Sequence, residues 1–410
     1  MRSSSLRKII GVLLVILVIV VGWLGYAQYN SYERGKRLQA TERKLANQER
    51  RSRYENMVHE LREETLRKIG SASNEYKNIT KSNNPAIKRM NTQLKAAQFV
   101  GTAMVVKKGK IIYNRGYGYS NFSKNLKNTA NSMFMINSVQ KSMTGALIMQ
   151  QVQAGNLSLT EKLSKFYPQV PGASKITIRN LLDMTSGLHL NAWPNYGTTE
   201  DEIADYVASH IANMYPLGTF HYEPGDYTLL SGILKKVTGE SYYRLFNTNI
   251  VEKFKLQQTG FLPTFTQLPG GAIGYGGMPG VRDYQKKNRF TTQEITNELG
   301  VGDVYMSAGD LYKVEKGIIT GKITSPQMAF TQITPVNSTG SYGGGFYRLP
   351  SLNGYYTHGL GNFYESTIVL SKDAKTAVVL MSNYHEATTM KVQSTEPIAK
   401  TTYEDILSQG

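Results

Sequence analysis

Ser138 and Lys141 are the residues of this 410-residue chain whose types and spacing best support covalent chemistry. They lie in the stretch 134–149, FMINSVQKSMTGALIM, where an extended apolar run gives way to a helix-like pattern. Positions i and i+3 share one face of a helix, so the Lys141 amine can reach the Ser138 hydroxyl. A serine nucleophile needs such a neighbouring base. The pair therefore predicts acyl transfer through a serine.

The spacing alone does not establish this chemistry, because Ser5 and Lys8 repeat it near the N-terminus. Ser138 is also a good N-cap residue, and a cap stabilises a helix by about 1 kcal/mol without any catalysis. The order of the segments that follow favours the catalytic interpretation.

Three later segments carry a resemblance to a known family. They read ITIRNLLDMTSGLHL at 176–190, FHYEPGDYTLLSGILKKVTGESY at 220–242 and YYTHGLGNF at 355–363. Together with the Ser-x-x-Lys, in this order, they resemble the serine β-lactamase-like family: class C β-lactamases, penicillin-binding proteins, and related esterases and D-amino-acid-specific peptidases. The likeness covers residues 99–384.

The resemblance implies roles for four side chains. Ser138 corresponds to the acyl-accepting nucleophile, and Lys141 to the residue that takes its proton. Tyr222 corresponds to the tyrosine that hydrogen-bonds the serine oxygen and passes a proton to the leaving group. His358 corresponds to the strand position held by lysine in β-lactamases and by histidine in many relatives. An ordinary strand histidine is the alternative for His358.

The same resemblance implies an oxyanion hole made of backbone N–H groups. One donor is Ser138, and the second comes from Leu360 or Gly361 on the late strand. Gly359 on this strand is expected to line the substrate. Losing one such donor typically costs about 3 to 4 kcal/mol of transition-state stabilisation.

Two positions depart from the family pattern. Tyr222-Glu223-Pro224 has proline where the family has asparagine, and proline offers neither an amide side chain nor an N–H. A substrate contact is lost unless Glu223 or Asp226 replaces it. Leu360 stands where the family has glycine and is expected to narrow the approach to the strand. Weak turnover of β-lactams is the expected consequence.

The composition excludes other site chemistries. Cysteine is absent, so disulfides and thiolate catalysis are excluded. The six histidines are scattered without the short spacings typical of metal ligands, so the sequence predicts no metal site and no cofactor.

Residues 9–27 form an uncharged, mostly aliphatic stretch of the length that crosses a bilayer. Basic residues in the tip 1–8 favour a cytoplasmic N-terminus, although basic residues also follow the stretch. A cleaved signal peptide is the alternative, but the apolar stretch is longer than a usual signal core. We expect a transmembrane signal-anchor with the bulk of the protein outside.

The charged segment 28–69 predicts a solvated helical stalk, with a short dimerising coiled coil as the alternative. The sequence leaves the oligomeric state open. Residues 70–93, rich in Ser, Asn and Lys at their start, are predicted to be a linker, and residues 94–410 the catalytic domain.

Within this domain the secondary-structure pattern predicts an α+β fold. Alternating apolar runs at 99–121 and 363–384 indicate strands at both ends, and helical patterns lie between them. We expect an antiparallel sheet built from both termini, flanked by helices, with a mostly helical inserted subdomain. This is the β-lactamase and transpeptidase architecture.

The formal net charge of +17 predicts an affinity for anionic polymers. Nucleic acid is excluded as a partner by the expected external location, which leaves wall polymers and anionic lipid headgroups of a Gram-positive-type surface. The sequence therefore predicts a membrane-anchored extracellular hydrolase of D-alanyl amides or esters on peptidoglycan or teichoic acid. The alternative is a weakly active or inactive protein of the same fold that binds wall polymer.

Overall fold

The computed structural model of the chain describes residues 2–69, 75–196, 198–265, 268, 270–277, 283–290, 297–336, 341–385 and 395–409. The chain divides into two compact units, residues 1–56 and 57–410. The first unit is helical and belongs to the long helix α1 (Arg2–Ile69).

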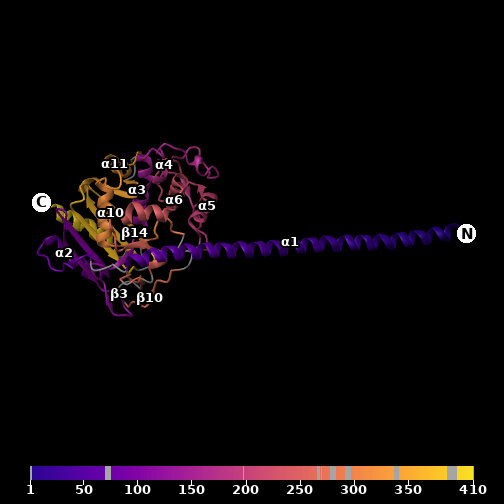
Figure 1. The fold of residues 1–410 in the computed structure, drawn as a ribbon, viewed down its shortest axis with the longest axis horizontal. Helices are drawn as coiled ribbons and strands as arrows, with labels where there is room; N and C mark the ends of the chain where they lie inside the picture. Colours follow the sequence, from indigo (N-terminus) through magenta and orange to yellow (C-terminus); the bar gives the residue numbers. More distant parts are fainter. Residues whose placement is uncertain are drawn as a thin grey trace. The chain divides into compact units, whose positions relative to one another are not determined.

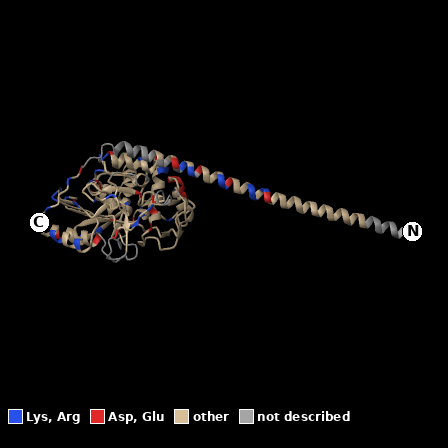
Figure 2. Ribbon diagram, turned by 90° about the horizontal axis from the view of Figure 1, so that it is seen from below, with Lys and Arg blue, Asp and Glu red and all other residues tan. Residues whose placement is uncertain are grey.

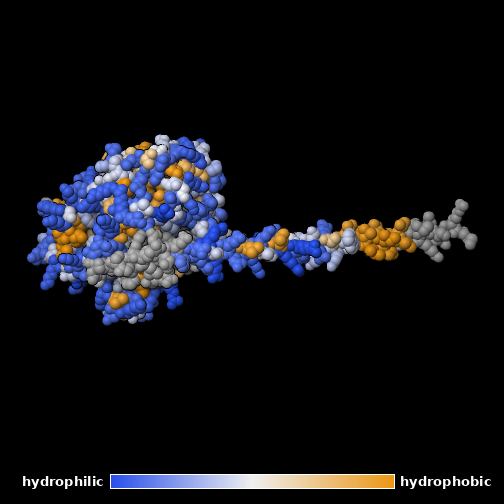
Figure 3. Space-filling model, viewed as in Figure 1, coloured by the Kyte–Doolittle hydropathy of each residue, from blue (hydrophilic) through white to orange (hydrophobic). Residues whose placement is uncertain are grey.

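From residue 11, helix α1 carries an apolar section whose side chains are all exposed. Val12, Leu17 and Trp23, for example, each expose more than half of their surface. Figure 3 shows this section as one hydrophobic band, and Figure 2 shows charges of both signs along the part of the helix that follows. Among the described residues, one helical segment is long and apolar enough to cross a membrane. It lies within Gly11–Arg53, and its mean hydropathy reaches 2.2.

The second unit contains the antiparallel sheet that the sequence predicts. Seven strands follow the order β12-β13-β14-β15-β16-β1-β2. The N-terminal strand β1 pairs directly with the C-terminal strand β16, so both ends of the domain meet inside the sheet. These strands are β1 (Gly101–Lys107), β2 (Lys110–Tyr117), β12 (Tyr342–Gly343), β13 (Phe346–Leu349), β14 (Gly354–Gly361), β15 (Tyr364–Ser371) and β16 (Ala377–Ser382). The predicted α+β fold is confirmed (Figure 1).

Local sequence signals explain the hairpin β1–β2 and its turn. Lys108 and Gly109 both have positive φ, as the two central residues of a tight hairpin turn require.

The small sheets are β5 (Met133–Met135) with β11 (Val304–Ser307) and β8 (Thr259–Phe261), β3 (Tyr119–Asn121) with β4 (Leu126–Lys127), β6 (Leu188–His189) with β7 (Ala212–Asn213), and β9 (Tyr275–Gly276) with β10 (Lys286–Lys287).

Two helices cover one face of the large sheet. They are α2 (Pro85–Ala96) and α12 (Thr395–Leu407), and their apolar residues form one cluster with side chains of β1, β2, β15 and β16. Asn84 caps α2 through its side chain, and Pro85 occupies the first turn, where a missing N–H is not needed.

Residues 75–93 do not form the linker that the sequence predicts. Tyr76 is buried and donates to Asp310 at 2.8 Å, and Ile79 forms a β-bridge with Asn114. Helix α2 buries Ile87 completely. The domain therefore begins well before residue 94. The few apolar residues of this polar segment are enough to pack it against the rest of the domain. Residues 70–74 of the predicted linker lie outside the described part.

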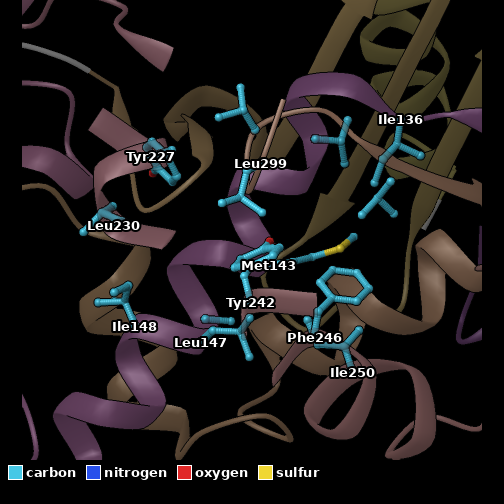
Figure 4. Packing of buried hydrophobic residues seen from close by; sticks show 14 of the residues in the cluster. Ile136, Met143, Leu147, Ile148, Tyr227, Leu230, Tyr242, Phe246, Ile250 and Leu299 are labelled. Carbon is cyan, nitrogen blue, oxygen red and sulfur yellow. The ribbon is translucent and has the colours of Figure 1, made fainter. Parts of the chain in front are cut away.

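The helical subdomain lies against the opposite face of the sheet. Its central element is α3 (Gln140–Gln153), whose Met143, Leu147 and Ile148 are fully buried in the main core. Figure 4 shows these side chains packed against residues of neighbouring helices. The other helices are α4 (Ile178–Leu182), α5 (Glu200–His210), α6 (Pro224–Thr238), α7 (Tyr242–Phe246), α8 (Leu262–Phe265), α10 (Ala308–Ile319) and α11 (Pro326–Ile333), with short 3-10 or π turns at η1 (Asn137–Val139), η2 (Leu163–Lys165), η3 (Asn247–Glu252) and η4 (Pro350–Leu352).

Candidate active site

Ser138 lies in the turn η1, between strand β5 and helix α3. The preceding Asn137 has φ +47°, a left-handed conformation that asparagine tolerates better than most residues. Its side-chain amide donates to the backbone oxygens of Gly361 at 3.3 Å and Tyr364 at 3.4 Å. These bonds attach the turn to the hairpin between β14 and β15. Ser138 is therefore presented, half-buried, beside the end of β14.

Lys141 makes the contact that its spacing predicts. Its Nζ lies 2.8 Å from Ser138 Oγ, and its side chain is completely buried. Nζ also donates to the backbone oxygen of Val301 at 3.4 Å. A serine hydroxyl held against an amine in this way can lose its proton as it attacks a carbonyl carbon.

The loop that carries Val301 is held in place by α3 itself. Thr144 Oγ1 donates to the oxygen of Gly300 at 2.7 Å, and Gln140 Nε2 donates to Asp303 Oδ1 at 2.7 Å. Burial raises the pKa of Asp303 to about 7, which reduces the negative charge behind the site at neutral pH. One helix therefore positions both Lys141 and the loop that its amine contacts.

Tyr222 approaches the same amine from the helical subdomain. The centroid of its ring lies 5.3 Å from Lys141 Nζ, and the ring packs edge-on against Tyr342 at 6.2 Å. The backbone N–H of His221 donates to the oxygen of Met184 at 2.9 Å, which anchors the segment. The structure therefore brings Ser138, Lys141 and Tyr222 together.

His358 is not in this group. Its Nε2 lies 3.0 Å from Glu365 Oε1, and its Nδ1 lies 3.9 Å from Glu396 on α12. The opposite residue on β15, Thr367, contacts Thr395 of α12 at 2.6 Å between the two hydroxyl oxygens. Residues directly opposite each other in a sheet point to the same face. His358 therefore faces α12, and this placement differs from the one that the sequence predicts.

The face of β14 that meets Ser138 carries Gly359 instead. A Cβ on Gly359 would lie 2.1 Å from the backbone oxygen of Ile136 and 2.8 Å from the backbone nitrogen of Ser138, so only glycine fits. Side chains alternate along a strand, so Thr357 shares this face with Gly359. Thr357 is a residue that sequence reasoning missed. The Leu360 side chain points to the other face, so it does not narrow the approach to the strand on the Ser138 face, as the sequence predicts that it would.

The register of the hairpin also distinguishes the two predicted oxyanion donors. Asn362 and Phe363 both have positive φ, as in a two-residue hairpin turn, and Gly361 pairs with Tyr364 across it. The closing pair of such a turn exchanges both backbone hydrogen bonds, so the Gly361 N–H points toward β15. The N–H of Leu360 then points to the opposite edge, where strand β13 pairs only as far as Tyr356. Leu360 is the donor that the geometry leaves available beside Ser138.

Comparison with known proteins identifies the fold and its chemistry. The family model described as Beta-lactamase matches residues 87–401. The chain belongs to the β-lactamase family. PbpX of Bacillus subtilis, named as a penicillin-binding protein, is 31% identical over 297 residues, which are 72% of this chain and 73% of PbpX.

Two further matches come from Staphylococcus aureus. A teichoic acid D-alanine hydrolase is 26% identical over 344 residues, 83% of this chain and 82% of that protein. The crystal structure of FmtA superposes with a TM-score of 0.69 and 26% identity, covering 82% of this chain and 90% of FmtA. As a member of the β-lactamase family with these relatives, the protein is a serine hydrolase.

Pro224 stands where the family has asparagine, and neither nearby carboxylate takes over the role of that asparagine. Glu223 is buried and caps α6: its Oε1 accepts from the Gly225 N–H at 2.7 Å, and its Oε2 from the Leu190 N–H at 3.0 Å. Asp226 is fully buried, accepts from the Ser186 hydroxyl at 2.7 Å, and has its pKa raised by burial. Both carboxylates thus bond inside the protein, which differs from the predicted substrate contacts.

Proposed function

We propose that this β-lactamase-family protein hydrolyses D-alanyl esters or amides of cell-wall polymers through an acyl-enzyme on Ser138. The observation that carries the proposal is the 2.8 Å contact between Ser138 Oγ and the buried Lys141 Nζ. A buried amine with one hydroxyl at hydrogen-bonding distance is arranged for proton transfer rather than for a surface ion pair.

In the acylation step, Ser138 Oγ attacks the carbonyl carbon of the D-alanyl group while the Lys141 amine takes the hydroxyl proton. The carbonyl oxygen gains negative charge and is held by the N–H groups of Ser138 and Leu360. Collapse of this intermediate breaks the bond from the carbonyl carbon to the leaving atom, which is a polymer oxygen in an ester and the nitrogen of the terminal D-alanine in a D-alanyl-D-alanine amide. Tyr222 and Lys141 return the proton to that leaving atom.

In the deacylation step, a water molecule takes the place of the leaving group. Lys141 and Tyr222 accept its proton as its oxygen attacks the ester carbon on Ser138. Breaking the Ser138 ester bond then releases free D-alanine when the substrate is an ester. When the substrate is a D-alanyl-D-alanine amide, D-alanine has already left in the acylation step, and this step releases the shortened peptide. The proton returns to Ser138 Oγ in both cases. The cycle therefore consumes one water for each D-alanyl group and needs no cofactor.

The substrate class is supported by the relatives and by the charge. The Staphylococcus aureus relative is named a teichoic acid D-alanine hydrolase. The net charge of +17 suits a polymer that is rich in phosphate. Esters and amides react through the same acylation step. The shape of the cleft therefore determines which polymer is the substrate.

We further propose that residues 9–27 anchor the protein in the membrane, with the catalytic domain outside a Gram-positive-type cell. The exposed apolar section of α1 supports the anchor. The basic tip, with Arg2, Arg7 and Lys8, supports a cytoplasmic N-terminus.

A binding protein without turnover is the second candidate. The observation that favours it is the inward placement of Glu223 and Asp226, which leaves the position of the family asparagine without a polar replacement. Such a protein would retain affinity for wall polymer when Ser138 is changed.

The test measures D-alanine release by the full chain in detergent micelles from D-alanylated teichoic acid and from a D-alanyl-D-alanine peptide. Ser138→Ala is compared with Ser5→Ala, because Ser5 and Lys8 form the same spacing in the N-terminal segment. We expect S5A to match the wild type and S138A to lose release by roughly a thousandfold or more. Intact mass after an acylating probe locates the adduct. Release that S138A retains contradicts the proposal, and polymer binding without release by either protein supports the second candidate.

A further inference from the structure

His189, His221 and Glu223 form a cluster beside the active site. One ligand-type atom from each residue lies within 4.8 Å of the other two. His189 Nδ1 and Glu223 Oε2 are 3.0 Å apart, and the two imidazole ring centroids are 5.6 Å apart. His189 is far from His221 and Glu223 in the sequence, which is why the spacing of the histidines predicts no metal site.

Contacts with the surrounding fold hold all three residues in place. His189 belongs to the short strand β6, and Glu223 is the N-cap of α6. The ring of His221 stacks on Tyr215 with centroids 3.6 Å apart. Glu223 is almost fully buried, and the N–H groups of Gly225 and Leu190 orient its two oxygens. The carboxylate therefore keeps its direction, while both half-buried imidazoles remain accessible from solvent.

Two imidazole nitrogens and one carboxylate oxygen are a donor set typical of zinc sites with an open coordination position. Around a tetrahedral zinc ion with bonds of about 2.0 to 2.2 Å, ligand atoms stand roughly 3.3 Å apart. The His189–Glu223 pair already has about this separation. No two of the three atoms are more than 4.8 Å apart, so His221 must approach the other two by at most about 1.5 Å, which rotation of its half-exposed ring permits.

We propose that His189, His221 and Glu223 bind a divalent transition-metal ion of the zinc class, with solvent in the fourth position. Tyr222 lies between two of the three ligands in the sequence. The ion therefore fixes the backbone on both sides of the residue that contacts Lys141. Binding itself depends only on these three side chains, so the inference stands independently of the proposed hydrolase activity.

The experiment titrates ZnCl2 into the metal-stripped full chain in detergent micelles by isothermal titration calorimetry. Co²⁺ is used in parallel as a spectroscopic probe, because low-coordinate cobalt absorbs visible light strongly. The variants are His221→Ala, His189→Ala and Glu223→Gln. His210→Ala is the matched control, because His210 also stacks on a tyrosine, Tyr206, with ring centroids 3.9 Å apart. The chain has no cysteine, so thiolates contribute no background binding.

We expect one zinc ion per chain with micromolar or tighter affinity. H221A, H189A and E223Q should each weaken binding by roughly tenfold or more, whereas H210A should bind as the wild type does. The H221A variant removes only a half-buried ring, and circular dichroism is used to check that it is folded. Absence of saturable binding at one equivalent, or equal affinity of H221A and H210A, overturns the proposal.

Discussion

Thr357 carries a buried hydroxyl for which the structure shows no hydrogen-bond partner among the described residues. It shares the strand face of Gly359, which touches the Ser138 turn. Leaving a buried polar atom unpaired destabilises the fold, so an isosteric apolar side chain should be tolerated. We predict that Thr357→Val keeps or raises stability and lowers kcat/KM for a D-alanyl ester about tenfold.

Two control variants separate a site role for Thr357 from a structural one. Thr357→Ser restores the hydroxyl and should recover activity. Thr367→Val removes a hydroxyl on the opposite face, where it contacts Thr395, and should lower stability without changing kcat/KM of the folded protein. Full activity of T357V would show that the residue only packs.

Glu315 is a second buried residue, and its protonation should change how the stability of the fold depends on pH. Ser142 Oγ lies 2.6 Å from Glu315 Oε1 and 2.8 Å from the Val139 oxygen, and a hydroxyl can donate to only one of them. A protonated Glu315 supplies the second proton. Burial raises the pKa of Glu315 to about 8, in agreement with this geometry.

The raised pKa of Glu315 predicts how stability depends on pH. Between the ordinary glutamate pKa of about 4.3 and the folded value of about 8, the folded chain binds more protons than the unfolded chain. The contribution of Glu315 to the free energy of unfolding is therefore complete at acidic pH. It is lost as pH rises toward 8, by up to about 1.4 kcal/mol per pH unit. Glu315→Gln should flatten this slope in urea unfolding curves at pH 5, 6, 7 and 8. Parallel slopes for both proteins contradict the assignment.

Among the elements, α12 is fastened to the sheet by Glu365 of β15. The buried Glu365 carboxylate accepts from the N–H of Thr395, at the start of α12, at 2.9 Å, and from His358 at 3.0 Å. Removing it leaves both donors without this acceptor. We predict that Glu365→Ala lowers the free energy of unfolding by about 2 to 3 kcal/mol. Glu396→Ala, which removes a more exposed carboxylate paired with Lys400, should change it by less than about 1 kcal/mol, measured by urea unfolding.

Strand β14 shows where prediction from the sequence ends. Long alternating apolar runs predicted the strands at both ends of the domain, and those strands are present. The segment Thr-His-Gly-Leu-Gly at 357–361 has no such alternation to determine which face is buried. A shift of one residue exchanges the two faces of a strand. The strand itself was therefore predictable, but the placement of His358, Leu360 and Thr357 relative to Ser138 was not.

Contacts between distant segments limited the prediction in the same way. The Ser138–Lys141 contact is local, so its spacing was enough to predict it. Glu223 is an unusual N-cap residue, and nothing near it in the sequence indicates that its carboxylate bonds to His189 and Leu190. Asp226 likewise finds Ser186 only through the packing of two distant segments.

For the whole molecule, the charge of +17 predicts how the enzyme responds to salt. Attraction between a basic protein and a phosphate-rich polymer is screened as the Debye length falls from about 10 Å at 0.1 M salt to about 3 Å at 1 M. We predict that the KM for D-alanylated teichoic acid rises several-fold over this range, with little change in kcat. A neutral nitrophenyl ester of D-alanine with a blocked amine is the control, and its KM should stay constant because it carries no charge to attract. An equal rise for both substrates would mean that salt acts on the fold or on the active site, and that the basic surface does not recruit the polymer.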